Sequence, residues 1–377
     1  MRSLLALASG AEGTTAGLLA LAASAVAVAL PALLAAVLLR RLRLGSSRRA
    51  AEDPTTPRVI LVTGASSGLG ALLLDALRAA FPDAVVYGTS RGGWPIPSDP
   101  ETSVEPSDRP LGVPFPSDDD DATNPDDASK EHAAAKEKPR SHRHHHPIPP
   151  LLALDVTSEA SVSALFAAIR RRHGTLDCLV NNAGAVIATH ASRTSDADAS
   201  SQMETNFLGP VRVVRHACAA MKDSLSKRIL IVGSIGGRVG LPFQSMYSAS
   251  KAAVMVYADA LRTETKSDGF RVTLVEPGDM RPGMVNAAKA AGFDDDPIAK
   301  RATDIMRAEE ARGTEMRVAA GAIVRAARQN APPGRVLVGQ DAWEVEMLTR
   351  LVPHWAREYL LASHYRVPPR DNAWIRI

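Results

Sequence analysis

The chain has 377 residues, of which 45% are apolar, and its net charge is +3 at neutral pH. This length allows one α/β domain of about 250 residues with extensions. Acidic and basic residues nearly cancel and no basic stripe is interleaved with aromatics, which argues against a nucleic-acid-binding surface. The two cysteines, Cys178 and Cys218, stand in apolar runs. Two cysteines do not make a disulfide framework in so long a chain, so we expect reduced thiols and a reducing compartment.

The N-terminal segment differs from the rest of the chain. Residues 17–39 are uncharged and rich in Leu, Ala and Val. About 20 apolar residues cross a bilayer as a helix, and one proline, here Pro31, is tolerated. The arginines within 40–49 favour a cytosolic location for the residues after them. We therefore expect a single-pass membrane anchor and basic flank at 1–50. A cleaved secretory signal, an organelle transit peptide and a buried core helix fit less well.

After a polar linker at 46–57, short apolar runs alternate with longer helical patterns. Such alternation is typical of right-handed βαβ units, which build a parallel sheet covered by helices on both faces. The sequence predicts a doubly wound α/β domain of about seven strands at 58–339, followed by a C-terminal extension at 340–377. We expect strands at 58–63, 84–89, 151–154, 176–181, 228–233, 271–276 and 335–339, and helices at 69–81, 158–173, 202–224 and 244–266.

The segment 92–150 breaks this rhythm. It contains repeated prolines, an aspartate run at 118–121 and a basic, histidine-rich stretch at 141–146. It has too few apolar residues to pack, so we expect a disordered surface insertion between the second and third strands. Its neighbouring histidines could bind a metal, but solvated side chains are the favoured interpretation. We expect no metal site.

A glycine-rich turn joins the first strand to the first helix. Gly64 permits the tight turn, Gly68 lets backbone approach a diphosphate, and Gly70 allows close helix–strand packing. Phosphates would bind at the positive end of the helix. No Gly-Lys-Ser/Thr follows, which excludes a P-loop. The motif predicts a dinucleotide-binding site formed by Thr63, Gly64, Ser66, Ser67, Gly68, Leu69 and Gly70.

The end of the second strand indicates which dinucleotide binds. A site for NAD usually offers a carboxylate here for the ribose 2′-OH, whereas this chain offers Ser90 and Arg91. A hydroxyl and a guanidinium suit a 2′-phosphate, so NADP(H) is the expected cofactor. The alternative is that Arg91 is simply a solvated residue.

Three polar residues further on stand at informative positions. Ser234 follows a strand, and Tyr247 and Lys251 are separated by one helical turn, on one face. The phenol has an ordinary pKa near 10, and a nearby ammonium would lower that pKa. Such a pair is suited to proton transfer. A turn with the sequence Asn-Asn-Ala-Gly lies at 181–184, which alone is also consistent with a plain loop.

Together these motifs resemble the short-chain dehydrogenase/reductase family in its compact single-domain form. The resemblance covers 58–339 apart from the insertion, and implies a Rossmann-type sheet and NADP(H)-dependent interconversion of a carbonyl and an alcohol. It implies that Tyr247 is the general acid and base, that Ser234 polarises the substrate oxygen and that Lys251 holds the nicotinamide ribose. Asn206 would fix a water in the proton relay, or else would bond only backbone. The further cofactor-binding residues implied are Asp155, Val156, Asn182, Ala183, Gly184, Tyr247, Lys251, Pro277 and Gly278. Asp155 would lie near the adenine, or else begin the cap of the next helix.

Two features depart from the family pattern. Pro282 stands where relatives often carry a threonine that contacts the nicotinamide amide, which puts that contact in doubt. The second departure is the long insertion after Arg91. Homodimers or homotetramers are usual in the family, packed through the helices that carry Asn206 and Tyr247.

The substrate is expected to be hydrophobic. The segment 284–315 would close the pocket, and aromatic and aliphatic residues within 340–377 could line it, rest on a membrane or pack structurally, which is the favoured interpretation. With the anchor, these features resemble the membrane-associated hydroxysteroid, retinoid and lipid-ketone members of the family, facing the cytosol from the endoplasmic reticulum. The alternatives are a non-catalytic NADPH-binding sensor or scaffold, and a soluble NAD-linked alcohol dehydrogenase of an organelle.

Overall fold

A seven-stranded parallel sheet forms the centre of the protein. The computed structural model describes residues 55–94, 151–283, 289–290 and 296–367. The strand order is β11-β7-β6-β4-β1-β2-β3, and every neighbouring pair is parallel. The expected doubly wound sheet of about seven strands is therefore confirmed. The strands are β1 (Val59–Val62), β2 (Val85–Ser90), β3 (Leu152–Ala153), β4 (Cys178–Asn181), β6 (Arg228–Val232), β7 (Arg271–Pro277) and β11 (Arg335–Val338).

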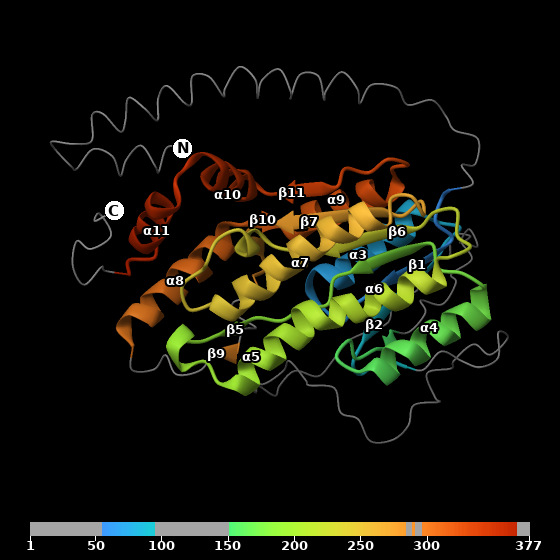
Figure 1. Ribbon diagram of the computed structural model, residues 1–377, viewed down its shortest axis with the longest axis horizontal. Helices are drawn as coiled ribbons and strands as arrows, with labels where there is room; N and C mark the ends of the chain where they lie inside the picture. The colour runs from blue at the N-terminus through green and yellow to red at the C-terminus, as the bar shows by residue number, and fades with distance from the viewer. Residues whose placement is uncertain (1–54, 95–150, 284–288, 291–295, 368–377) are drawn as a thin grey trace, which may run out of the picture. The chain divides into compact units, whose positions relative to one another are not determined.

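Helices cover both faces of this sheet. Helices α4 (Glu159–His173), α6 (Gly209–Ala220) and α7 (Ser245–Glu264) run side by side over one face (Figure 1). Helices α3 (Gly68–Ala80) and α9 (Met316–Arg328) pack together on the other. Each layer of helices encloses its own hydrophobic core against the sheet.

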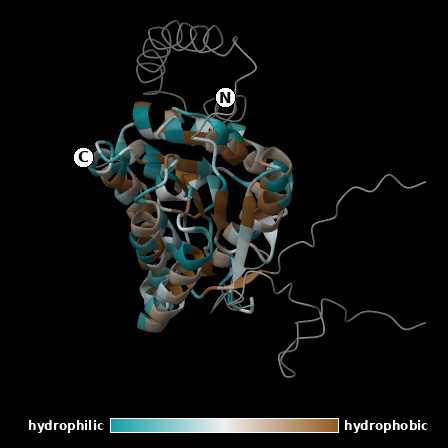
Figure 2. Cartoon of the chain, turned by 90° about the vertical axis from the view of Figure 1, so that its right-hand side faces the viewer, coloured by the Kyte–Doolittle hydropathy of each residue, from teal (hydrophilic) through white to brown (hydrophobic). Residues whose placement is uncertain are grey.

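Strand β1 shows why the sheet is buried on both sides. All four of its residues are buried and apolar. Val59 and Leu61 contribute to the core under α4, α6 and α7, whereas Ile60 and Val62 contribute to the core under α3 and α9. Successive side chains of a strand point to opposite faces, so a continuous apolar run is what a strand between two helix layers requires. Figure 2 shows these hydrophobic stretches along the central strands.

The helix predicted at 202–224 is interrupted in the structure. It consists of α5 (Asp196–Met203), a π-helical turn η4 (Glu204–Leu208) and α6, which ends at Ala220. The periodicity revealed the helix but not the extra residue of the π turn. Helix α5 also begins before the predicted boundary at 202. At its start the Ser195 side chain accepts a hydrogen bond from the backbone N–H of Asp198.

Several short elements and C-terminal helices were not anticipated. Helix α8 (Pro297–Arg312) begins at the cap Asp296, whose carboxylate accepts from two backbone N–H groups. Two small parallel pairs join β5 to β9 and β8 to β10. The remaining elements are β5 (Ile187–Ala188), β8 (Met280–Arg281), β9 (Lys289–Ala290), β10 (Thr314–Glu315), α10 (Gln340–Leu351), α11 (His354–His364), and the 3-10 turns η3 (Ala191–Arg193) and η5 (Ile235–Gly237).

The pairing of β2 with β3 continues at the start of the predicted insertion. Trp94 forms a parallel bridge with Leu152 and donates its N–H to the carbonyl oxygen of Leu151 over 2.7 Å. The predicted insertion beyond Trp94 and the predicted anchor at 17–39 lie outside the described residues. Among the helices that are described, none is long and apolar enough to cross a membrane.

Candidate active site

The glycine-rich turn is held by the loop after β4. Asn182 donates from Nδ2 to the carbonyl oxygens of Thr63 and Gly64, at 3.0 Å each. The buried Thr63 hydroxyl accepts from the backbone N–H groups of Asn182 and Ala183, at 2.9 and 3.0 Å. Gly64 has φ +64° and a Cβ there would lie 2.8 Å from the Ala183 Cα, so glycine is required for two reasons. The role of Thr63 is thus to join the two loops.

The turn leaves the start of α3 open to a ligand. The Ser67 side chain at the N-cap makes no capping hydrogen bond, and Ser66, Ser67 and Gly68 are exposed. Unpaired backbone N–H groups at a helix start form a site for an anion such as a diphosphate. Gly68 has φ +54°, the left-handed region that glycine adopts without strain. These residues therefore fit the diphosphate of a dinucleotide.

Ser90, Arg91 and Asp155 gather at one end of a large cavity that also reaches this helix start. Arg91 is exposed directly after β2. Asp155 accepts from the Thr157 N–H and hydroxyl at 2.9 and 2.7 Å. Burial raises the pKa of Asp155, but these hydrogen bonds and the positive charge of Arg91 outweigh it and lower the pKa overall. The cap of α4 is Ser158, not Asp155, because the Ser158 hydroxyl accepts from the backbone N–H of Ser161.

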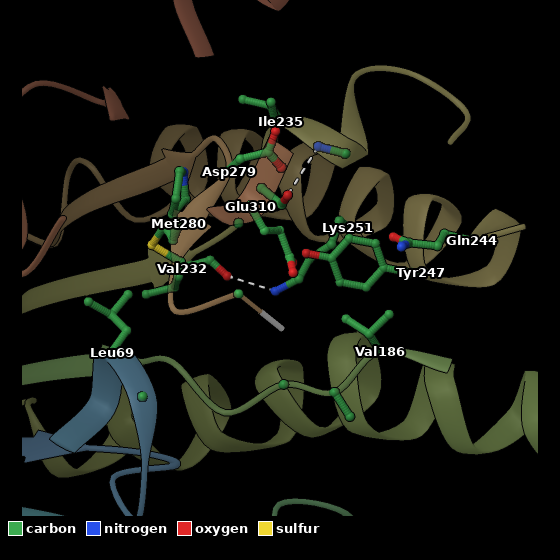
Figure 3. A pocket seen from close by; sticks show the side chains of 18 of the residues that line it. Leu69, Val186, Val232, Ile235, Gln244, Tyr247, Lys251, Asp279, Met280 and Glu310 are labelled. Atoms are coloured by element: carbon green, nitrogen blue, oxygen red, sulfur yellow. Dashed lines mark hydrogen bonds between the residues drawn. The ribbon is translucent and has the colours of Figure 1, made fainter. Parts of the chain in front are cut away.

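Ser234, Tyr247 and Lys251 also line this cavity. The part of the cavity formed by the glycine-rich turn, Arg91 and Asp155 is called the nucleotide half below. Tyr247 and Lys251 are 8% and 6% exposed, and the Lys251 ammonium lies 5.9 Å from the centre of the Tyr247 ring. Lys251 Nζ donates to the Val232 carbonyl oxygen over 3.1 Å (Figure 3). Burial lowers the pKa of Lys251 to about 8. The structure therefore brings the three predicted polar residues together.

The Tyr247 pKa is shifted opposite to the direction expected from Lys251 alone. Burial raises it, a hydrogen bond with Ser234 lowers it, and the charges of Glu310 and Asp279 raise it further. Without cofactor, burial outweighs any lowering by the neighbouring ammonium. The phenol is therefore protonated at neutral pH, which suits a proton donor.

Asn206 lies in the π turn and is 1% exposed. Its Oδ1 accepts from the Ala185 N–H over 2.8 Å, and its Nδ2 donates to the Ala185 carbonyl over 2.9 Å and to the Ser250 hydroxyl over 3.1 Å. Ser250 in turn donates to the Tyr247 carbonyl over 2.7 Å. Asn206 thus joins the loop after β4 to the helix of Tyr247 from behind the cavity. Its role in a proton relay stays a prediction.

The volume of this cavity is about 1220 Å³. A typical site for one ligand occupies about 300–1,000 Å³, so a dinucleotide and a second molecule fit together. Of the predicted site residues, Thr63 and Asn206 lie behind the wall. The wall itself contains Gly64, Ser66, Ser67, Gly68, Leu69, Gly70, Arg91, Asp155, Val156, Asn182, Ala183, Gly184, Ser234, Tyr247, Lys251, Pro277 and Gly278.

Sequence reasoning assigned no role to the carboxylates of this cavity other than Asp155. Asp279 directly follows Pro277 and Gly278, which were expected to bind the cofactor, so its sequence position indicated that it lies near the site. The other carboxylates come from helices that were not predicted. Burial, and then the charges of Asp341, Glu309 and Glu310, raises the pKa of Asp279 to about 7. His364 on α11 contacts Glu309 over 2.6 Å, and this hydrogen bond raises the pKa of His364. The carboxylates of the lining are Asp155, Asp279, Glu309, Glu310, Asp341 and Glu344.

The C-terminal aromatic and aliphatic residues divide into two groups. Leu360, Leu361 and Tyr365 line the cavity. Trp343, Trp355 and Tyr359 are instead 46%, 41% and 52% exposed, so packing does not bury them within the described residues. Pro282 also lines the cavity, next to the β8–β10 pair. Of the segment 284–315 that was expected to close the pocket, residues 284–288 and 291–295 lie outside the described part of the chain.

Comparisons with known proteins agree with this geometry. The family model "short chain dehydrogenase" matches residues 127–291. A 3-ketodihydrosphingosine reductase from Bacteroides thetaiotaomicron is 31% identical over 288 residues, which covers 75% of this chain and 88% of that protein. The crystal structure of a short-chain dehydrogenase from Streptomyces avermitilis is 23% identical, with a TM-score of 0.57, and covers 83% of this chain and 97% of that one.

A second solved structure, a short chain dehydrogenase from Burkholderia cenocepacia in complex with NADP, is 22% identical with a TM-score of 0.52, covering 82% of this chain and 98% of that one. These two structures establish the fold, and the reductase relative establishes the family. The chain belongs to the short-chain dehydrogenase/reductase family, whose members are oxidoreductases that use a nicotinamide cofactor on carbonyl and alcohol groups.

Proposed function

We propose that this protein uses NADPH to reduce a ketone or aldehyde on a hydrophobic, lipid-like molecule, with Tyr247 as the proton donor. The observation that carries the proposal is that Ser234 and the buried residues Tyr247 and Lys251 line the same cavity as the glycine-rich turn. When bound, the cofactor supplies the hydride. The chain's own residues have to place the carbonyl, donate one proton and exclude water.

Tyr247 donates the proton, and two neighbours assist it. Its burial keeps the phenol protonated at neutral pH until the substrate oxygen gains charge. Ser234, which hydrogen-bonds the same phenol, stabilises the phenolate that remains, since its bond lowers the Tyr247 pKa. Lys251 has further N–H groups besides the one that donates to Val232, and these are suited to ribose hydroxyls.

The preference for NADPH rests on Ser90 and Arg91, which lie at the Asp155 end of the cavity. A charge-assisted hydrogen bond contributes about 1.5–3 kcal/mol. Arg91→Ala should therefore raise the KM for NADPH about 10-fold or more, and leave that for NADH almost unchanged. A variant with the same ratio of the two KM values as the parent protein would contradict the assignment.

The lipid-like substrate is supported by the wall of the cavity and by the reductase relative. Met306 of α8 and Tyr365 are buried together, with Leu241 and Leu361 packed against them, and all four line the cavity. The relative from Bacteroides thetaiotaomicron is named for a 3-keto lipid. A long-chain 3-keto lipid is therefore the first candidate, ahead of steroids and retinal.

Oxidation of NADPH and of NADH by the full chain tests the proposal, across steroids, retinal, long-chain 3-keto lipids and acyl-dihydroxyacetone phosphate. We expect turnover with NADPH that Tyr247→Phe abolishes while NADPH binding is kept. Tight NADPH binding without turnover of any of these carbonyls would favour a non-catalytic sensor. Turnover that survives in Tyr247→Phe would refute the role of the tyrosine.

We also propose that 1–50 anchors the enzyme to the endoplasmic reticulum membrane, with the catalytic domain in the cytosol. The support is the apolar composition of 17–39 and the arginines that follow it. Resistance to carbonate extraction is the expected result, and release into the supernatant would favour an organelle address instead.

A further inference from the structure

The first turn of helix α10 packs directly on the loop that follows β7. The Asp341 carboxylate accepts the backbone N–H of Asp279 at 2.5 Å, across 62 positions of the chain. It also lies against the Cα of Gly278, since a Cβ at that position would overlap all three atoms of the carboxylate. Gly339, with φ +108°, leads the chain into α10, and a Cβ there would crowd the same carboxylate. Glycines on both sides therefore make room for this contact.

Backbone hydrogen bonds hold the same loop from its two flanks. Gly278 donates its N–H to the Val338 carbonyl oxygen of β11 over 2.9 Å. The Asp279 carbonyl oxygen accepts from the N–H of Thr314 of β10 over 2.8 Å. Asp341 adds a charged side chain to these neutral bonds, and hydrogen bonds to a charged group are the stronger kind. The position of the loop 277–279 thus depends on a residue of the C-terminal helix α10.

Helix α10 is itself fixed against the site. Glu346 is 4% exposed and forms an ion pair with Arg238, the residue that ends η5. Ser234 is the N-cap of η5, and its hydroxyl accepts from the backbone N–H of Gly236. One helix therefore contacts both the turn that begins at Ser234 and the loop after β7, which gives Asp341 a defined place relative to Ser234.

The strand order shows which end of a dinucleotide reaches this loop. The diphosphate site at the start of α3 follows β1, and Arg91 follows β2, on one side of β1 in the sheet. Strands β6 and β7 lie on the opposite side of β1, and Ser234 and Gly278 follow them. Ligands of such sheets lie across the carboxyl ends of the strands. A dinucleotide whose 2′-phosphate lies at Arg91 therefore extends its nicotinamide toward Ser234 and the loop after β7.

The polar groups that this loop offers to the ring come chiefly from its backbone. Pro277, Gly278 and Pro282 all line the cavity, and none of the three has a polar side chain. The two prolines also lack an N–H group. Whether a backbone group of the loop meets the carboxamide of the ring thus depends on where the loop is held, and Asp341 is the side chain that holds it.

We propose that Asp341 is a positioning residue for the cofactor, which keeps the loop 277–279 in the place where it contacts the nicotinamide ring. This inference rests on the proposed function, because it requires NADPH in the cavity. The carboxylate takes no part in the reaction. Its loss frees the backbone at Gly278 and Asp279, so the ring loses a fixed wall, whereas the adenosine end at Arg91 keeps its contacts.

Two ligands separate this role from a general effect on the fold: NADPH, and 2′-phospho-ADP-ribose, which is the same molecule without the nicotinamide. Calorimetry on the full chain should show NADPH binding more tightly to the parent protein. Asp341→Ala should weaken NADPH binding at least about 10-fold, as expected for a lost charge-assisted hydrogen bond. It should change the affinity for 2′-phospho-ADP-ribose by less than about 2-fold. Asp341→Asn keeps an acceptor oxygen in the same shape and should retain most of the NADPH affinity.

Glu344→Ala is the matched control, because it removes a carboxylate of the same helix and the same cavity. Glu344 accepts from the Gln340 side chain of its own helix over 3.0 Å. Its removal should change the affinities for the two ligands by the same factor, so that their ratio stays constant.

Gly278→Ala tests the contact from the other side and serves also if Asp341→Ala fails to fold. Its Cβ would displace the Asp341 carboxylate, so it should cause the same selective loss of NADPH affinity. Added to Asp341→Ala, it should weaken NADPH binding by less than about 2-fold further, because the two changes remove one contact.

Equal losses for the two ligands in Asp341→Ala, or no loss for either, would overturn the inference while NADPH binding by the parent protein leaves the proposed function standing. A parent protein that binds 2′-phospho-ADP-ribose as tightly as NADPH would overturn it as well, since the loop would then not hold the ring. Binding of neither ligand would refute the proposed function itself.

Discussion

Replacing Gly70 with alanine should lower both the free energy of unfolding and the affinity for NADPH, because Gly70 packs directly against the glycine-rich turn. Gly70 lies in the first turn of α3 and is buried. A Cβ there would overlap the Gly64 carbonyl oxygen and would lie 2.7 Å from Asn182 Nδ2 and 2.9 Å from the Gly64 carbonyl carbon. Two of these atoms are backbone of the glycine turn, and the third is the amide that holds it.

The magnitude combines three contributions. Overpacking of a tight interior costs about 1–3 kcal/mol. Displacing Asn182 weakens its hydrogen bonds to Thr63 and Gly64, each of which contributes about 1 kcal/mol. Alanine recovers about 1 kcal/mol, because glycine is the poorer helix former. We therefore expect the free energy of unfolding to fall by about 2–4 kcal/mol, and NADPH binding to weaken at least 10-fold.

Urea unfolding without cofactor measures the first quantity, and titration of the intrinsic fluorescence with NADPH measures the second. Gly240→Ala is the matched control, since Gly240 has an ordinary φ and a Cβ there would meet nothing within 4 Å. It should change stability by less than about 0.5 kcal/mol. If Gly70→Ala unfolds within that same margin of the parent protein, the tight packing of the turn against Asn182 is refuted.

Three further substitutions have defined signs. Lys251 has a pKa of about 8 against 10.5 in its ordinary state, so its charge destabilises the fold below pH 8 and this penalty disappears as the pH rises toward 10.5. Lys251→Met should therefore stabilise the cofactor-free protein by about 1–3 kcal/mol at pH 7 while abolishing turnover. Asp279 has a pKa of about 7 against 3.8, so the folded protein binds its proton more tightly and loses stability as the pH rises between those values. Asp279→Asn should stabilise the protein by about 1–4 kcal/mol at pH 8 and by little at pH 4. Glu276 is fully buried and accepts from Arg238 Nε and Nη2 at 2.8 Å each. Glu276→Gln weakens these charged hydrogen bonds while Arg238 keeps its ion pair with Glu346, so it should cost about 1.5–3 kcal/mol.

Midpoints of urea unfolding, measured across pH, test all three stability predictions. A different result would contradict each of them. A Lys251→Met protein no more stable than the parent at pH 7 would show that the ammonium is well solvated. A pH-independent effect of Asp279→Asn would exclude a raised pKa. Asp304→Asn, which removes the exposed partner of Arg307, is the control for Glu276→Gln and should cost less than about 1 kcal/mol. Equal losses for the two would refute the burial argument.

The sheet and the nucleotide half could be predicted because their signals are local. Strand β1 is a short run of four apolar residues, and the glycine turn comes directly after it. Ser234 follows a strand, and the spacing of Tyr247 and Lys251 places both on one helical face. Each of these patterns is complete within a few residues, so its meaning does not depend on distant parts of the chain.

The other half of the cavity could not be predicted because distant elements build it. Glu310 and Asp341 acquire a role only when α8 and α10 fold back over the strand ends, and no spacing in the sequence records that approach. The cap at Asp296, with Pro297 after it, was nevertheless a readable start signal for α8. The direction of the Tyr247 pKa shift likewise depends on burial, which the spacing to Lys251 does not reveal.

The bridge between Trp94 and Leu152 has a consequence for how this chain tolerates change in length. The N–H of Trp94 already donates to Leu151, so the chain leaves and re-enters the sheet at adjacent positions. Trp94 and Leu151, which flank 95–150, are therefore held by the sheet. Closing a loop costs only about 0.6 kcal/mol more for each doubling of its length. Natural variants could lengthen or shorten this stretch, or a protein engineer could exchange it for a reporter domain, with little effect on the free energy of folding.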